Sequence, residues 1–262
     1  DTLSYRVSLK RRYNQGKSTF FFFKYECFCK GQLLVDVEDA IATLMPRSEL
    51  TQAKGVSWEP EDLAEGSNDT AFFPAIAPNL GVYSKEQILS FANGDAYACF
   101  GEGYEELRSH KTSPRITSGL ALQIDEVTEF DLKGGPNKRG YLKAIKRLSP
   151  EEWFFEAHFH TDPCMPAALI GAGCFQAISF YMAACGLTER KDRYKFSPIA
   201  NQIFKYTGGG QVGVEEKFLT YEVFVQSVSD GDQPFVEATV LVTTSSGIKV
   251  LITEIGVQLL AP

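Results

Sequence analysis

Residues 153–187 of this chain read WFFEAHFHTDPCMPAALIGAGCFQAISFYMAACGL, and this stretch decides the fold. Its second half, 166–187, is apolar on all sides, which is typical of a helix buried inside a globular core. A membrane span of about 20 residues would have a similar composition. Because Gln176 lies in its middle and strand-like sequence flanks it, we interpret it as a buried helix over about 165–186 that ends at Gly186.

Strand-like runs rich in Val, Phe, Tyr and Thr lie on both sides of this helix. They cover 120–130, 139–148 and 153–159 before it, and 202–212, 217–228, 234–243 and 248–259 after it. The turn sequences at 229–232 and 245–247 predict that the last three strands form hairpins. One long buried helix against a largely antiparallel sheet is an α+β fold.

The N-terminal part repeats this order loosely. The aromatic stretch 18–29 and the stretch 32–45 predict a β-hairpin, whereas Lys10-Arg11-Arg12 is interpreted as a solvated loop. Segment 17–44 resembles segment 216–243 in its order of aromatic strand, turn and second strand. We therefore expect 1–58 to be the closing strands of a preceding copy of the fold. A connector with a short helix, capped by Ser84 and Gln87, follows over 59–111, and a complete domain over 112–262.

Composition limits the classes of function. The 262 residues contain 26 Lys and Arg against 33 Asp and Glu, a net charge of −7, which disfavours binding to nucleic acid. Six cysteines without a CxxC pair predict reduced thiols. The N-terminus lacks an apolar signal core, so we expect a cytoplasmic protein. The start without methionine suggests a piece of a larger polypeptide.

Two of the three histidines, His158 and His160, stand close together. On a strand they would share one face, and with Asp162 they could bind zinc. Pro163 ends the strand geometry and no other histidine-rich segment is near, so we expect no metal. The simpler alternative is a packed or solvent-facing strand histidine.

The stretch 153–186 resembles the signature of the hot-dog β-hydroxyacyl thioester dehydratases of fatty-acid synthesis, W-F-F-x-x-H-F-x-x-D-P-x-M-P-G followed by the central helix. Segments 95–101 (DAYACFG), 205–228 and 253–260 (TEIGVQLL) are similar to dehydratase regions of polyunsaturated fatty-acid synthases. The resemblance implies a hot-dog fold, a sheet wrapped around a long helix, with a partial second hot dog at the N-terminus. It also implies elimination of water from 3-hydroxyacyl chains on the phosphopantetheine of an acyl carrier protein, without another cofactor.

The same resemblance assigns the site. His158 is the catalytic base, and a histidine near its ordinary pKa of about 6.5 can accept a proton at neutral pH. The carbonyl of Cys164 holds this base, and the amide of Ala167 polarises the thioester carbonyl. The substrate-binding positions implied are Phe159, Cys164, Met165, Pro166 and Ala167.

Two departures from the family pattern bear on activity. Ala167 replaces the family's glycine, and the family's acid, which protonates the leaving hydroxyl, falls on Ala172, which cannot donate a proton. Gln176 matches the glutamine one helical turn after that acid, although it could instead be a buried amide bonded to backbone. The acid could be lost naturally or by engineering. In this family the site lies between two hot dogs, so a second hot dog, in cis or in trans, could supply an acid. The main alternative function is that of a catalytically silent structural or dimerising hot dog. A thioesterase and a metal hydrolase are less favoured alternatives.

Overall fold

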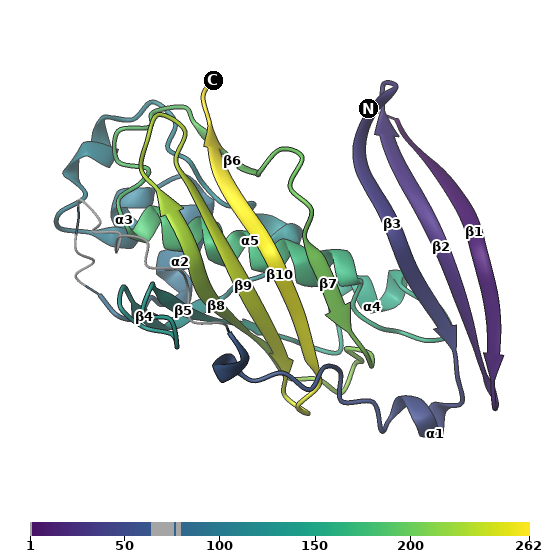
Figure 1. The fold of residues 1–262 in the computed structure, drawn as a ribbon. Coiled ribbons are helices and arrows are strands. Elements are labelled where there is room, and N and C mark those ends of the chain that lie inside the picture. Colours follow the sequence, from purple (N-terminus) through teal and green to yellow (C-terminus); the bar gives the residue numbers. More distant parts are fainter. Residues whose placement is uncertain (1, 64–75, 77–79) are drawn as a thin grey trace. The chain divides into compact units, whose positions relative to one another are not determined.

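The chain forms two units that divide between Ala53 and Lys54. The computed structural model describes residues 2–63, 76 and 80–262. Figure 1 shows the first unit as a sheet in purple, and the second as a long helix crossed by strands coloured from teal to yellow. Within the connector predicted over 59–111, residues 64–75 and 77–79 lie outside the described residues.

The N-terminal unit is a three-stranded antiparallel sheet. It contains β1 (Leu3–Gln15), β2 (Ser18–Cys29) and β3 (Gln32–Leu44), followed by the short helix α1 (Arg47–Leu50). The β2–β3 hairpin confirms the prediction. The interpretation of Lys10-Arg11-Arg12 as a loop is wrong, because these residues lie within β1. The guanidinium groups of Arg11 and Arg12 lie 4.5 Å and 5.9 Å from the ring centroids of Phe22 and Phe21. These cation–π contacts stabilise the basic residues on the strand.

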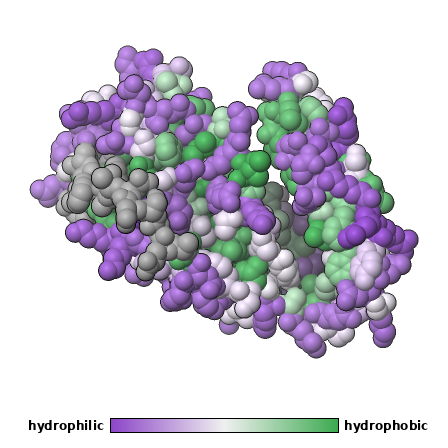
Figure 2. Space-filling view, viewed as in Figure 1, coloured by the Kyte–Doolittle hydropathy of each residue, from purple (hydrophilic) through white to green (hydrophobic). Residues whose placement is uncertain are grey.

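One face of this sheet is apolar and exposed. Tyr5, Val7 and Leu9 alternate along β1 and are each more than 60% exposed. They pair with Cys27, Tyr25 and Phe23 of β2, so the apolar face continues across the strands. Figure 2 shows green apolar patches on the surface of the N-terminal unit.

The second unit contains a seven-stranded antiparallel sheet in the order β4-β5-β8-β9-β10-β6, with β7 also paired to β10. The strands are β4 (Glu126–Asp131), β5 (Tyr141–Arg147), β6 (Lys195–Pro198), β7 (Lys205–Gly208), β8 (Phe218–Ser229), β9 (Phe235–Thr244) and β10 (Lys249–Leu260). The three long strands β8, β9 and β10 and both of their hairpin turns confirm the predictions.

Helix α5 (Ala167–Ala184) is the centre of the core and packs against β5, β8, β9 and β10. It is long and apolar enough to pass as a membrane span, but 67% of it is buried inside the fold, as expected of a core helix. It ends in a Schellman motif, because Leu187 N–H donates to the Met182 carbonyl and Gly186 N–H to that of Ala183. Gly186 has the positive φ, 78°, that this motif requires. The predicted hot-dog arrangement of a sheet around one helix is confirmed.

Short helices surround this core. They are α2 (Lys85–Ala92), α3 (Ala96–Phe100), α4 (Trp153–Ala157) and the 3-10 helices η1 (Pro60–Asp62), η2 (Glu105–Ser109) and η3 (Gly119–Ala121). Helix α2 begins with the predicted capping box, in which Ser84 and Gln87 bond to each other's main-chain N–H. The Tyr104 hydroxyl donates to the carbonyl of Ala184, which fixes η2 to the C-terminal end of α5.

Three strand predictions need correction. Residues 153–159 contain helix α4, not a strand, because the neighbours Phe154 and Phe155 are both buried and therefore do not alternate between two faces. Of 120–130 only Glu126–Asp131 is a strand, after the 3-10 helix η3, and of 202–212 only Lys205–Gly208. Strand β6 was not predicted.

Candidate active site

His158 lies directly after α4, in a tight loop that the main chain closes. Its N–H donates to the carbonyl of Phe154, and its carbonyl accepts from the N–H of Cys164, both at 2.8 Å. Its ring Nδ1 lies 3.0 Å from the carbonyl oxygen of Cys164. Both the main chain and the ring of His158 are therefore tied to Cys164, in the geometry that the family resemblance implies.

The bond to Cys164 selects one tautomer of His158. A carbonyl oxygen only accepts hydrogen bonds, so Nδ1 carries the proton in the neutral ring and Nε2 keeps its lone pair. Cys164 Sγ lies 3.6 Å from the same Nδ1. Burial and, after it, the Asp162 carboxylate raise the pKa of this thiol, so it stays protonated near pH 7 and is a poor nucleophile. The site thus presents an imidazole nitrogen, not a thiolate.

The segment before α5 is held by the loop that precedes β8. Met165 N–H donates to the Val212 carbonyl at 2.9 Å, and Cys164 forms an isolated antiparallel bridge with Gly213. Met165 is buried at 4% exposure in the main core, and its part in substrate binding stays a prediction. These contacts fix where the helix starts relative to His158.

The N-terminus of α5 is accessible. Pro166 is the N-cap residue, and its carbonyl accepts from the N–H of Leu169 at 2.9 Å. Ala167 and Ala168 are exposed, and the first turn carries no acidic residue. Main-chain N–H groups at a helix start, together with the positive end of the helix dipole, stabilise negative charge on an oxygen atom. The start of α5 can therefore polarise a carbonyl.

Ala172 and Gln176 occupy successive turns of α5, as their spacing requires, and differ in environment. Ala172 is partly exposed, whereas Gln176 is buried at 6% exposure. Gln176 Nε2 donates to the carbonyl of Ala121, and its Oε1 accepts from the N–H of Gln123, both at 2.7 Å. The amide is thus bonded to backbone at both ends, which is the alternative that the sequence left open. A part for Gln176 in the reaction stays a prediction.

Phe159 stacks on the ring of His158. Its ring centroid lies 4.0 Å from that of His158, with 29° between the planes, and the side chain is 55% exposed. Phe204, which is 45% exposed, makes an edge contact with Phe175 of α5. Phe159 is therefore an accessible apolar side chain next to His158.

His160 and Asp162 do not join His158 in a metal site. In the described part of the chain, no group of three or more His, Cys, Asp and Glu side chains could hold a metal ion. His160 is exposed, and Asp162 accepts a hydrogen bond at 2.7 Å from Gln211. The sequence had not pointed to Gln211, although it lies beside the three glycines Gly208–Gly210, which mark a tight loop.

The sheet around one long helix defines a hot-dog domain, and comparisons with known proteins place it in the dehydratase class. The model of the FabA-like domain matches residues 117–249, just over half of the chain. The chain therefore belongs to the FabA-like domain family. The matched region contains α4, α5 and most of the seven-stranded sheet.

Similar proteins occur among large synthases. A polyunsaturated fatty acid synthase polypeptide of Thraustochytrium is 28% identical over 238 residues, which cover 87% of this chain and 16% of that protein. Among solved structures, a bifunctional dehydratase-cyclase domain of ambruticin biosynthesis matches 98% of this chain and 68% of its own, at 15% identity and a TM-score of 0.33. S. sahachiroi AziG matches 47% of this chain and 85% of its own, at 10% identity and a TM-score of 0.32.

Proposed function

We propose that this chain provides the histidine-bearing half of a 3-hydroxyacyl thioester dehydratase site in a polyunsaturated fatty-acid synthase. The observation that carries the proposal is the 3.0 Å contact between His158 Nδ1 and the Cys164 carbonyl, next to the exposed N-terminus of α5. It combines a base with a free Nε2 and main-chain donors for a developing enolate. Phe159 would contact the acyl chain.

The reaction divides between the parts of the site. His158 Nε2 accepts the α-proton, the Cα–H bond breaks, and negative charge moves to the thioester oxygen near Ala167 N–H. As the Cα–Cβ double bond forms, the Cβ–O bond breaks, and the hydroxyl needs a proton to leave as water. In the family's arrangement that proton comes from the acid of the facing hot dog, so the His158 site requires a second hot dog, and Ala172 leaves the histidine of that second hot dog without an acid.

The partners follow from this division. The substrate is a 3-hydroxyacyl chain on the phosphopantetheine of an acyl carrier protein, and no further cofactor takes part. The second hot dog belongs to the same polypeptide or to another one. The exposed apolar face around Tyr5, Val7 and Leu9 supports the view that residues 1–58 close a preceding hot dog, while 59–111 connect it to the complete hot dog of 112–262.

A catalytically silent hot dog is the second candidate, and Ala172 is the observation that favours it. In that case the domain would serve to complete or dimerise a neighbouring hot dog. Both candidates share the fold, so only activity separates them.

An elimination assay on 3-hydroxyacyl thioesters distinguishes the two. Carrier-bound substrate is incubated with the chain alone, with the chain joined to its preceding hot dog, and with the joined protein carrying His158→Ala. We expect enoyl product only from the joined protein with His158 intact. Equal product with and without His158 would exclude His158 as the base, and absence of product from all three would favour the silent hot dog.

A further inference from the structure

The loop before β8 runs antiparallel to the segment before α5. Cys164 forms an isolated bridge with Gly213, and the next pair, Met165 and Val212, is joined by a main-chain hydrogen bond of 2.9 Å. Both contacts are made by the main chain, so they do not depend on which side chains are present. The residue that follows in this pairing is Gln211.

The Gln211 side chain makes a contact of a different kind. Its Nε2 donates to the Asp162 carboxylate at 2.7 Å, across 49 residues of chain. Asp162 lies in the tight loop between His158 and Cys164, where its main-chain N–H and carbonyl both bond to Phe159, at 3.1 Å and 3.2 Å. Gln211 therefore ties the loop of His158 to the segment that fixes the start of α5.

The Asp162 carboxylate also lies near the residue that orients the base. After burial, the charge of Asp162 is the next cause that raises the pKa of the Cys164 thiol, so the two side chains are close to each other. The Cys164 carbonyl is the oxygen that lies 3.0 Å from His158 Nδ1. A change in the position of Asp162 is thus passed over two residues to the contact that sets the His158 ring.

The bond between Gln211 and Asp162 contributes little to stability by itself. Asp162 is exposed and Gln211 is partly exposed, and the loss of one such bond has little effect on the free energy of unfolding. The main-chain contacts of Cys164 and Met165 keep the segment folded without it. A change at Gln211 should therefore alter the loop of His158 without unfolding the domain.

We propose that Gln211 is a positioning residue of the dehydratase site, which acts through Asp162 to hold the His158 ring against the Cys164 carbonyl. The inference rests on the proposed function, because the position of the base matters only if elimination occurs here. The reaction needs Nε2 at a fixed place relative to the N-terminus of α5, and a misplacement of about 1 Å can cost about 10²-fold in rate.

Nitrogen NMR of the histidine rings in the full chain tests this geometry without any activity. At about pH 8.5, above the ordinary pKa of histidine, the His158 ring should carry its proton on Nδ1. Gln211→Glu has the same shape but offers no N–H to Asp162. We expect it to lower the ratio of Nδ1–H to Nε2–H in His158 about tenfold, the effect of one lost hydrogen bond. Adding Asp162→Asn exchanges donor and acceptor, and should restore the wild-type signals.

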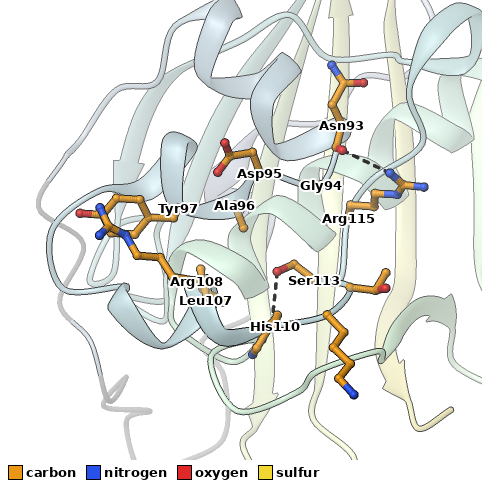
Figure 3. Close-up of a pocket in the computed structure, with 12 residues that line it drawn as sticks. Asn93, Gly94, Asp95, Ala96, Tyr97, Leu107, Arg108, His110, Ser113 and Arg115 are labelled. Atoms are coloured by element: carbon orange, nitrogen blue, oxygen red, sulfur yellow. Dashed lines mark hydrogen bonds between the residues drawn. The ribbon is translucent and has the colours of Figure 1, made fainter.

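His110 is the internal reference for these signals. It lines the surface pocket drawn in Figure 3, with its Nδ1 3.2 Å from the Ser113 hydroxyl and its Nε2 2.7 Å from the Glu189 carbonyl. Because a carbonyl oxygen only accepts hydrogen bonds, the neutral His110 ring carries its proton on Nε2, opposite to His158. The two rings therefore give different patterns, and the pattern of His110 should not change in any variant.

Gln202→Glu is the matched control. Gln202 Nε2 donates to the Glu237 carboxylate at 2.8 Å, so the variant makes the same chemical change against another carboxylate. Glu237 pairs with Ser227 near the end of β8, whereas the loop of Gln211 leads into the start of β8 at Phe218, about 30 Å away along the strand. We expect Gln202→Glu to leave the His158 signals unchanged. Thermal melting checks that every variant is folded.

Elimination kinetics of the protein joined to its preceding hot dog give the second measurement. Gln211→Glu should lower kcat about tenfold with little change in KM, and the exchanged pair should recover most of the loss. The inference is overturned if folded Gln211→Glu keeps the wild-type His158 signals, if it keeps the kcat of an active wild type, or if Gln202→Glu changes either one as much. If the His158 signals respond as expected while the wild type forms no enoyl product, the hold of Gln211 on His158 is supported and only the proposed function fails.

Discussion

The ring Nδ1 of His158 lies 3.0 Å from the carbonyl oxygen of Cys164, six residues further along the chain. The reverse main-chain bond, from Cys164 N–H to the His158 carbonyl, closes the same loop. The carbonyl oxygen only accepts hydrogen bonds, so this contact keeps the proton of the neutral ring on Nδ1 and leaves Nε2 able to accept one.

The first prediction concerns this base. In the protein joined to its second hot dog, His158→Ala should lower kcat/KM for elimination by about 10²–10⁴-fold, because a positioned general base contributes that much. The rate of enoyl thioester formation measures the effect. His160→Ala is the control and should change little, because His160 is exposed and outside the loop bonds. A larger loss in His160→Ala than in His158→Ala would reverse the assignment.

The second prediction concerns Gln176. Replacement by Leu leaves the Ala121 carbonyl and the Gln123 N–H without their buried partner, so it should lower the free energy of unfolding by about 2–4 kcal/mol. Urea denaturation measures this change. Gln211→Leu, which removes one exposed hydrogen bond to Asp162, should cost less than about 1 kcal/mol. Equal losses in both variants would show that the bonds to 121–123 are not important for stability.

The third prediction uses two glycines on the same helix. A Cβ on Gly173 would lie 2.3 Å from Cζ of Tyr221, a ring that is fully buried. We expect Gly173→Ala to destabilise the fold by about 1–3 kcal/mol despite the better helix propensity of alanine. A Cβ on Gly171 meets nothing within 4 Å, so Gly171→Ala should be neutral or stabilising by up to about 1 kcal/mol. Thermal melting compares the pair, and a stable Gly173→Ala would contradict the packing of Tyr221 on α5.

The fourth prediction is a pH dependence. Burial alone would raise the pKa of Glu216, but hydrogen bonds from Ser245 and from the N–H and hydroxyl of Ser246 outweigh it, so the pKa is lowered from its usual 4.5. A lowered pKa in the folded state adds stability that is complete above the unfolded pKa and is lost as the pH falls through the folded pKa. Urea unfolding below about pH 5 should therefore show a steeper loss for the wild type than for Glu216→Gln. Parallel curves would contradict this.

Local sequence signals predicted the centre of the fold, and long-range contacts decided the rest. The apolar run of α5 and the turns between β8, β9 and β10 need only neighbouring residues, so they were predicted. Helix α4 was misread, although Ser149, whose hydroxyl accepts from Glu151 N–H, stands just before it, a weak signal of a helix start. The alternation of Tyr5, Val7 and Leu9 is also typical of a strand. The basic run Lys10-Arg11-Arg12 that follows it is typical of a solvated loop, so the sequence alone did not predict β1.

The candidate site shows the same difference between local sequence signals and long-range contacts. His158 followed from its motif, because the residues of the motif are contiguous. The hydrogen-bond partners of Gln176 lie more than fifty residues earlier in the chain. The hydrogen bond from Met165 N–H to the Val212 carbonyl joins residues with a similar separation in sequence. No local pattern indicates such pairs, since only the packed fold brings them together.

The last prediction tests the missing acid. Ala172 lies one turn before Gln176 on a partly exposed part of α5, where a longer side chain can reach out of the core. Ala172→Asp should raise the elimination rate about 10²–10⁴-fold in the site formed with a histidine of the neighbouring hot dog, because a positioned acid contributes that much. Ala172→Asn is the control, since it has the same shape and no acidic proton, and should not raise the rate.

The assay uses the joined protein, once with His158 and once with His158→Ala, since each hot dog lends its acid to its partner's site. A gain that persists in His158→Ala assigns the new acid to the other histidine. If a structure of the Asp variant places the carboxylate in the groove and the rate is unchanged, the missing-acid account is wrong and the silent hot dog is the better description.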